Sequence, residues 1–303
     1  MKAAIYFNEL QPLLYGYYIC KGVIFLHRKI SAAVFTVLTA MFMCGCTSDK
    51  NSVGQSTEYN GRGGRTPAET AFLTDGKEKV CYGQGYETDS DNRPVGAIQA
   101  QEKYGSYGGR FIFGKDDKTI HLTFDEGYEN GCTGKILDIL KEKKVTATFY
   151  VTLDYVKSSP ELVQRMINEG HEVGNHSCTH PSLPDISDDM VFEEIHGLET
   201  YISDNFGGYK TVTMRPPRGE FSVRTLRIAK NMGYDTVLWS FAYNDWNTDA
   251  QPDRDTAYRR ITSATHNGAV YLLHAVSETN TAILPDVIDY WLDNGYTVKS
   301  ISG

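Results

Sequence analysis

The stretch TIHLTFDEGYENGCTGKILDILKEKKVTATFYV, Thr119–Val151, contains two apolar, β-prone segments separated by a helical one. Strands are predicted over Thr119–Phe124 and Thr146–Val151, with a helix over Thr133–Lys143 between them. Two strands joined through a helix form a parallel βαβ unit. This unit places the chain in the α/β class.

The same alternation continues to the C-terminus. Several expected helices end at a glycine, as helix C-caps favour, and Pro160 and Pro285 suit first-turn positions. Roughly seven repeats of strand and helix predict a closed (β/α) barrel. An open doubly wound sheet is the alternative, although no Gly-rich dinucleotide loop is present. The further strands are expected over Glu172–Asn175, Thr211–Met214, Thr236–Ser240, Ala269–Leu273 and Thr297–Ile301, and the further helices over Pro160–Glu169, Asp188–Asn205, Val223–Met232, Asp253–His266 and Leu284–Asp293.

The N-terminus has the pattern of an export signal. A basic patch, His27–Lys29, precedes the apolar run Ile30–Met43 and the sequence CGC. Residues 1–46 resemble a bacterial lipoprotein signal, in which Cys46 would be lipidated after cleavage behind Gly45. An uncleaved membrane anchor is the alternative. Both interpretations place the rest of the chain outside the cytoplasm.

The segments that follow the signal differ in composition from the repeating part. Residues 47–79 are rich in Gly, Ser, Thr, Asn and Asp and are predicted to form a flexible tether. Residues 80–118 are predicted to form an irregular N-terminal arm that packs on the domain. Residues 119–303 are predicted to form the single folded domain.

Charge and cysteine content narrow the function classes. The formal net charge of the 303-residue chain is -8, which argues against a general nucleic-acid binder. Of the six cysteines, Cys20 and Cys44 would be removed with the signal. The last three, Cys81, Cys132 and Cys178, are an odd number without metal-site spacing, so free thiols are expected there.

Polar, reactive side chains follow five of the predicted strands. Active sites of such barrels lie at the C-terminal ends of the strands. Each residue alone is consistent with a cap, a turn or a surface charge, but together they would place unpaired charges in one cleft, which favours a functional site. Asp125 and Glu126 follow the first strand, His176 and His180 the third, Arg215 the fourth and Asp245 the fifth, and His274 ends the sixth.

This set of residues is typical of metal-assisted hydrolysis. Two histidines and a carboxylate form a hydrolytic zinc set that leaves one position open for water. The metal lowers the pKa of that water and polarises a carbonyl. A further carboxylate and a further histidine can serve as base and acid, and an arginine near the base would hold it ionised. The sequence therefore predicts hydrolysis of an amide or ester.

Five motifs carry a family resemblance. TFDEG (Thr123–Gly127), HSCTH (His176–His180), RPPRG (Arg215–Gly219), NDW (Asn244–Trp246) and LLH (Leu272–His274) resemble, in order, the five motifs of the polysaccharide deacetylases, carbohydrate esterase family 4 with its NodB-homology domain. The longer segments DEGYENG, RPPRGEFS, FAYNDW and LLHAVS are most similar to the peptidoglycan N-acetylmuramic acid deacetylases of the muramic δ-lactam pathway.

The resemblance implies a distorted (β/α)7 barrel and a role for each motif residue. It implies a monomeric enzyme of the bacterial cell wall that acts on peptidoglycan glycan strands, in the spore cortex or the vegetative wall. It also implies a divalent metal ion, with Zn preferred over Mn or Co. The implied roles are Asp125 as base, His274 as acid, Arg215 orienting Asp125, Asp245 tuning His274, and His176 and His180 as metal ligands. Tyr128, Trp246 and Arg218 are candidate substrate-binding residues.

Two positions depart from the family pattern. Glu126 stands where the family has an aspartate as third metal ligand, so either this longer carboxylate or water completes the site. Ala242 stands where the fourth motif usually begins with aspartate, while Asp245 keeps the position assigned to tuning.

Arg218 gives a hypothesis about the substrate. The family pattern has tyrosine here, and the backbone N–H at this position stabilises the oxyanion. N-acetylmuramic acid carries a lactyl carboxylate once its peptide is removed, and a guanidinium binds a carboxylate through charge-assisted hydrogen bonds. A surface arginine or a salt bridge to Glu220 is the alternative. The competing functions are deacetylation of N-acetylglucosamine, chitooligosaccharides or O-acetyl groups, and a catalytically weak glycan-binding protein.

Overall fold

The computed structural model describes residues 76–303. The predicted export signal, Cys46 and all but the last residues of the predicted tether lie outside this range. Within it, no helix is both long and apolar enough to cross a membrane.

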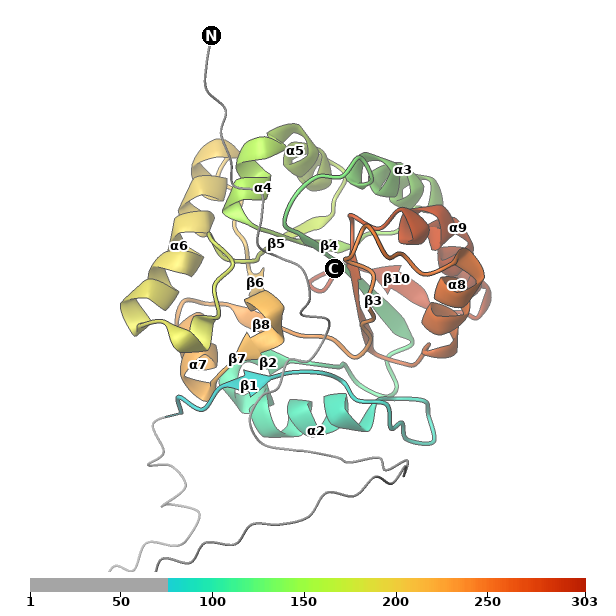
Figure 1. Cartoon of the computed structure of the whole chain (residues 1–303), viewed down its shortest axis with the longest axis horizontal. Coiled ribbons are helices and arrows are strands. Elements are labelled where there is room, and N and C mark those ends of the chain that lie inside the picture. Colours follow the sequence, from blue (N-terminus) through green and yellow to red (C-terminus); the bar gives the residue numbers. More distant parts are fainter. Residues whose placement is uncertain (1–75) are drawn as a thin grey trace, which may run out of the picture. The chain divides into compact units, whose positions relative to one another are not determined.

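Eight parallel strands form one curled sheet (Figure 1). The strand β3 (Thr119–Glu126) pairs with β9 (Ala269–His274) along one edge, and with β10 (Thr297–Lys299) and β4 (Thr148–Val151) along the other. The sheet continues from β4 through β5 (Glu172–Asn175), β6 (Thr213–Met214), β8 (Asp235–Val237) and β2 (Gly109–Arg110).

The curled sheet closes into a distorted barrel between the end of β8 and β9. An isolated β-bridge across this seam joins Phe241 and Tyr271. The N–H groups of Ser240 and Phe241 donate to the carbonyl of Val270, and Leu272 N–H donates to Phe241. Because β6 and β8 have only 2 and 3 residues, the barrel is irregular on this side. The predicted fold class is confirmed.

Three neighbouring strands, β9, β3 and β4, are buried almost completely. In β3, β4 and β9 every residue is buried except Asp125 and His274. Strands of a parallel sheet are covered on both faces, which explains the continuous apolar runs found in the sequence. The two exceptions lie at the C-terminal ends of their strands.

Helices surround the sheet on its outer side (Figure 1). Their first turns are capped by short polar side chains: Ser187 accepts from Met190 N–H, and Asp253 accepts from Thr256 N–H. The helices are α3 (Thr133–Lys143), α4 (Leu153–Ser158), α5 (Pro160–Asn168), α6 (Asp188–Asn205), α7 (Val223–Asn231), α8 (Arg254–Ser263) and α9 (Glu278–Asp293). All match predicted segments except α4, which was not predicted.

The first-turn position predicted for Pro285 is wrong. Pro160 is at the start of α5, but Pro285 lies inside α9. The helix begins seven residues earlier because Ser277 caps it, accepting a hydrogen bond from Asn280 N–H.

The segment before β3 is more regular than the sequence predicts. The helix α2 (Val95–Tyr104) and the strand β2 belong to it, and β1 (Val80–Cys81) pairs antiparallel with β7 (Glu220–Phe221). Tyr82 packs edge-on against both Phe111 and Trp239. The segment is therefore an integral part of one side of the barrel.

The cysteines depart from the sequence prediction at one position. Cys132 and Cys178 are free thiols, as expected. Cys81 is disulfide-bonded, so the free thiol expected there is wrong. The prediction rested on the odd number of cysteines left after removal of the signal.

Candidate active site

The strand ends bring the predicted base and acid together. Asp125 and His274 are paired residues of the neighbouring strands β3 and β9. Side chains at paired positions of adjacent strands point to the same face of a sheet and lie about 5 Å apart. The two side chains therefore enter the same cleft at the C-terminal end of the barrel.

Arg215 is the buried partner of Asp125. Its Nη1 donates to Asp125 Oδ1 at 2.8 Å, while Nε and Nη2 donate to the carbonyls of Val237 and Leu238 at 3.1 and 3.2 Å. The guanidinium also lies over the ring of Tyr150, at 4.3 Å from its centroid. Each nitrogen of this fully buried cation thus has a partner, which fixes its orientation.

The charges around Asp125 keep it ionised. Burial works to raise the pKa of this carboxyl, but Arg215, His176 and His274 outweigh burial and hold the pKa below its usual value. The carboxylate is therefore available as a proton acceptor throughout the neutral pH range.

The loop after β5 holds His176 and His180 next to each other. Their ring centroids are 4.9 Å apart, and His176 Nε2 is 3.6 Å from Asp125 Oδ2. Ser177 and His180 both have positive φ angles, and Ser177 Oγ accepts a hydrogen bond from His180 N–H. The loop therefore turns tightly enough to bring both rings to the cleft.

Both histidines are suited to bind a metal ion. His176 Nδ1 is 2.8 Å from the carbonyl oxygen of Arg215, which leaves Nε2 facing the cleft. Burial lowers the pKa of His176, and burial and the neighbouring His176 ring lower that of His180 to about 4. Both rings are therefore neutral near pH 7, the state in which imidazole binds metals.

Glu126 is turned away from the two histidines. As the residue after Asp125 on β3, its side chain points to the opposite face of the sheet. There it is fully buried and its oxygens lie 3.5 Å from the hydroxyl of Thr133, the first residue of α3. Among the described residues, no group of three histidine, cysteine or acidic side chains has metal-site geometry. Of the two arrangements expected for the third ligand, this structure does not adopt the one with Glu126.

Asp245 holds His274 through two hydrogen bonds. Its Oδ1 is 2.7 Å from His274 Nδ1, and its Oδ2 accepts from the backbone N–H of His274 at 2.9 Å. Burial alone would lower the pKa of His274, but the hydrogen bond and charge of Asp245 raise it above its usual value. The ring is therefore held in one orientation and retains its proton to higher pH.

The three predicted substrate-binding residues are all exposed. Tyr128 follows β3 and is 53% exposed, and Trp246 follows Asp245 and is 57% exposed. Arg218 lies in a turn after β6 with a φ of 61°. Among residues 76–303, Arg218 has no ion pair or hydrogen bond, and Glu220 lies near Lys79 instead, at 3.7 Å. The salt bridge between Arg218 and Glu220 is therefore not formed.

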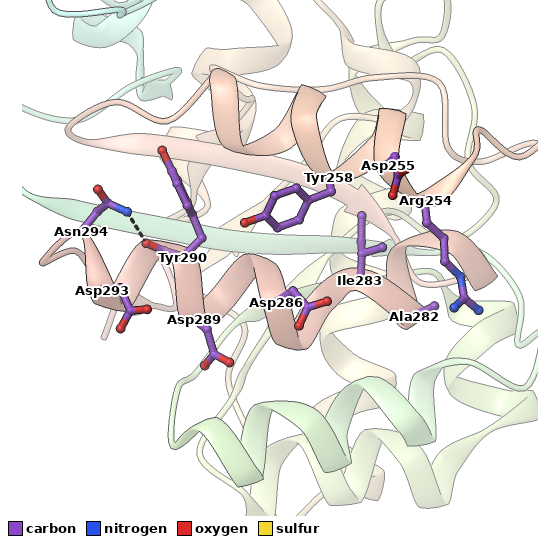
Figure 2. A pocket seen from close by; sticks show the side chains of 10 residues that line it. All are labelled: Arg254, Asp255, Tyr258, Ala282, Ile283, Asp286, Asp289, Tyr290, Asp293 and Asn294. Atoms are coloured by element: carbon purple, nitrogen blue, oxygen red, sulfur yellow. Dashed lines mark hydrogen bonds between the residues drawn. The ribbon is translucent and has the colours of Figure 1, made fainter.

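A hollow elsewhere on the molecule does not belong to this site. It has a volume of about 670 Å³ and lies between α8 and α9 (Figure 2). Four aspartates and two tyrosines are among its lining residues, and none of the strand-end residues is. We therefore assign the chemistry to the strand ends and not to this hollow.

Sequence reasoning missed several residues that support the site. Tyr150 packs on Arg215, and Asn280 donates to Asp245 Oδ2 at 2.5 Å. The N-cap pattern at Ser277 would have placed Asn280 in the first turn of a helix beside His274. No sequence signal marks Tyr150, because an aromatic residue in a buried strand is typical of the core.

Comparisons with known proteins agree with this geometry. Residues 114–237 match the family model described as polysaccharide deacetylase. The peptidoglycan-N-acetylmuramic acid deacetylase PdaA of Bacillus subtilis is 43% identical over 200 residues, which cover 66% of this chain and 75% of that protein. A chitooligosaccharide deacetylase of Rhizobium leguminosarum is 37% identical over 163 residues, covering 53% of this chain and 73% of that protein.

A solved structure supports the same assignment. The structure of Bacillus subtilis PdaA, a family 4 carbohydrate esterase, superposes with a TM-score of 0.71 at 39% identity and covers 75% of this chain and 96% of that one. Together with the five motifs and the curled sheet, these similarities show that the chain belongs to the polysaccharide deacetylases, carbohydrate esterase family 4.

Proposed function

We propose that this deacetylase removes the acetyl group from N-acetylmuramic acid in peptidoglycan, with a divalent metal ion bound by His176 and His180. The observation that carries the proposal is the pairing of Asp125 and His274 across β3 and β9 beside the two histidines. The similarity to PdaA and the exposed guanidinium of Arg218 support muramic acid as the substrate.

Asp125 acts as the general base. Its ionised carboxylate takes a proton from the attacking water, and Arg215 fixes its orientation through the 2.8 Å hydrogen bond. The backbone N–H of Arg218 has no acceptor among the described residues and is available to stabilise the developing oxyanion. A metal ion at the two histidines would lower the pKa of the water and polarise the acetyl carbonyl.

His274 acts as the general acid. With Nδ1–H donated to Asp245, its Nε2 proton passes to the amine nitrogen as the carbon–nitrogen bond breaks. Asp245 raises the pKa of His274, so the ring retains this proton to higher pH than a free imidazole does. The products are acetate and a free amino sugar.

Replacing Asp245 with Asn is expected to move the alkaline limb of the pH profile to lower pH. The acid must be protonated, so activity is lost as the pH rises through the pKa of His274, and Asp245 raises that pKa. We expect kcat to fall about 10- to 100-fold as well. The measurement is kcat/KM against pH for both proteins, and an unchanged alkaline limb would contradict the role of Asp245.

Arg218 is proposed to bind the lactyl carboxylate. Replacing it with Leu is expected to lower kcat/KM on peptide-free muramic acid glycans about 10- to 100-fold, because a hydrogen bond between charged groups contributes roughly 1.5–3 kcal/mol. Activity on chitooligosaccharides should change less than about twofold, since these sugars carry no lactyl group.

The two substrates also distinguish the competing functions. Arg259→Leu, which removes an exposed arginine of α8, is the matched control and should leave both activities unchanged. If Arg218→Leu lost activity equally on both substrates, Arg218 would not bind the lactyl carboxylate. A wild-type preference for chitooligosaccharides would favour N-acetylglucosamine as the natural substrate.

The cellular setting follows from the proposed substrate and from the sequence. We infer export through residues 1–46, lipidation of Cys46 and action in the cell wall as part of the muramic δ-lactam pathway. The patterns of the first 46 residues and of the longer motif segments support these inferences.

A further inference from the structure

The first turn of α9 contacts the carboxylate behind the proposed acid. Asn280 lies in this turn and its Nδ2 donates to Asp245 Oδ2 at 2.5 Å. Both side chains are buried, with exposed fractions of 2% and 0%. Asp245 thus accepts three hydrogen bonds, two from His274 and one from Asn280.

A second contact fixes which end of the Asn280 amide faces Asp245. The hydroxyl of Tyr243 donates to Asn280 Oδ1. A carboxylate can only accept hydrogen bonds, so the NH₂ group must face Asp245 and the oxygen must face Tyr243. The amide therefore has one orientation in which both of its ends are satisfied.

The same turn holds the loop that contains Asp245 and Trp246. Gln251 Nε2 donates to the carbonyls of Asp245 and Asn247, at 2.7 Å each. Ser277, the N-cap of α9, donates to Gln251 Oε1 at 2.5 Å and accepts from Asn280 N–H at 3.0 Å. Hydrogen bonds therefore connect both the backbone and the side chain of Asp245 to the first turn of α9, the backbone through Gln251 and the side chain through Asn280.

We propose that Asn280 is a positioning residue of the deacetylase, which fixes Asp245 so that His274 presents its Nε2 proton to the departing amine in a single orientation. Asn280 lies outside the five family motifs, and it acts through Asp245 without touching the substrate. The inference rests on the proposed role of His274 as the acid.

The test compares two substrates with different leaving groups. Asn280→Leu is expected to lower kcat for release of acetate from amidase-treated glycan strands about 10- to 100-fold, which is less than the full contribution of a general acid. Its KM should stay within about twofold of the wild-type value. Hydrolysis of an aryl acetate should change less than about twofold, because a phenolate leaves without protonation. A residue with only a structural role would lower both rates alike, and that result would overturn the proposal.

Further variants keep the test decisive. Asn280→Asp keeps the shape of the side chain but replaces the donor with a second acid, so it should also lose glycan activity at neutral pH. Asn294→Leu, at the exposed C-terminal end of α9, is the matched control and should behave as wild type. If Asn280→Leu lost glycan activity while Asn280→Asp kept it, and the two variants had equal melting temperatures, the result would contradict the role of Asn280 as a hydrogen-bond donor to Asp245.

His274→Ala, assayed in parallel, separates this inference from the one on which it rests. Retained glycan activity in that variant would refute the acid role of His274 itself. Lost activity in His274→Ala together with wild-type rates in Asn280→Leu would refute only the positioning role of Asn280.

Discussion

Replacing Asp125 with Asn is expected to lower kcat for acetate release by about 10²- to 10⁴-fold, the contribution typical of a general base. The amide has nearly the same shape and can still accept the hydrogen bond from Arg215 Nη1, so the fold should be retained. KM should change little, because Asp125 acts on water and not on the sugar. The change therefore removes proton transfer with the least disturbance to the site.

The measurement is acetate released from purified, amidase-treated glycan strands, with metal content determined on the same sample. Asp116→Asn, in the exposed turn before β3, is the matched control and should keep full activity. A variant Asp125→Asn that retains more than about a tenth of the activity would exclude Asp125 as the base. No acetate release by the wild-type protein with any divalent metal would favour the alternative, a catalytically weak glycan-binding protein.

Much of the fold and the grouping of the site residues could be predicted from the sequence. Parallel strands with alternating helices all end at one edge of a sheet, so residues that follow separate strands are brought together by topology alone. This is why Asp125, His176, Arg215 and His274 were expected in one cleft, and the contacts between them are found in the structure.

The direction of individual side chains could not be predicted in the same way. Asp125 and Glu126 are adjacent acids, and the sequence does not say which face of β3 each occupies. In the structure Asp125 lies in the cleft beside His274, and alternation along β3 places Glu126 on the opposite face, where Thr133 contacts its carboxylate. Burial and the negative charges of Glu129 and Asp125 raise the pKa of Glu126 well above its usual value, which favours a protonated side chain in that position.

The contacts that support Asp245 could not be predicted from the sequence either. Asn280 lies at the start of a helix and Gln251 in a loop, and no motif includes either residue. Asn280 was not recognised because the helix α9 was predicted to start later in the sequence. Their roles depend on which loops meet above the strand ends, and that depends on tertiary packing.

Removing the metal ion is expected to lower acetate release at least about 100-fold, since a metal contributes several kcal/mol to charge stabilisation in such reactions. Dialysis against a chelator should abolish activity, and Zn²⁺, Mn²⁺ or Co²⁺ should restore it. His176→Ala and His180→Ala should each lower both bound metal and activity. His196→Ala, on the outer helix α6, is the matched control and should change neither.

Glu126→Gln decides what completes the metal site. Its carboxylate faces Thr133 and not the two histidines, so this variant should bind metal with wild-type stoichiometry and affinity. That outcome would assign the remaining positions to water and would explain how the site tolerates a longer acid where the family has aspartate. Loss of metal in Glu126→Gln, at an unchanged melting temperature, would instead show that the carboxylate turns toward the histidines when the ion binds. The comparison separates a ligand from a buried neighbour without altering either histidine.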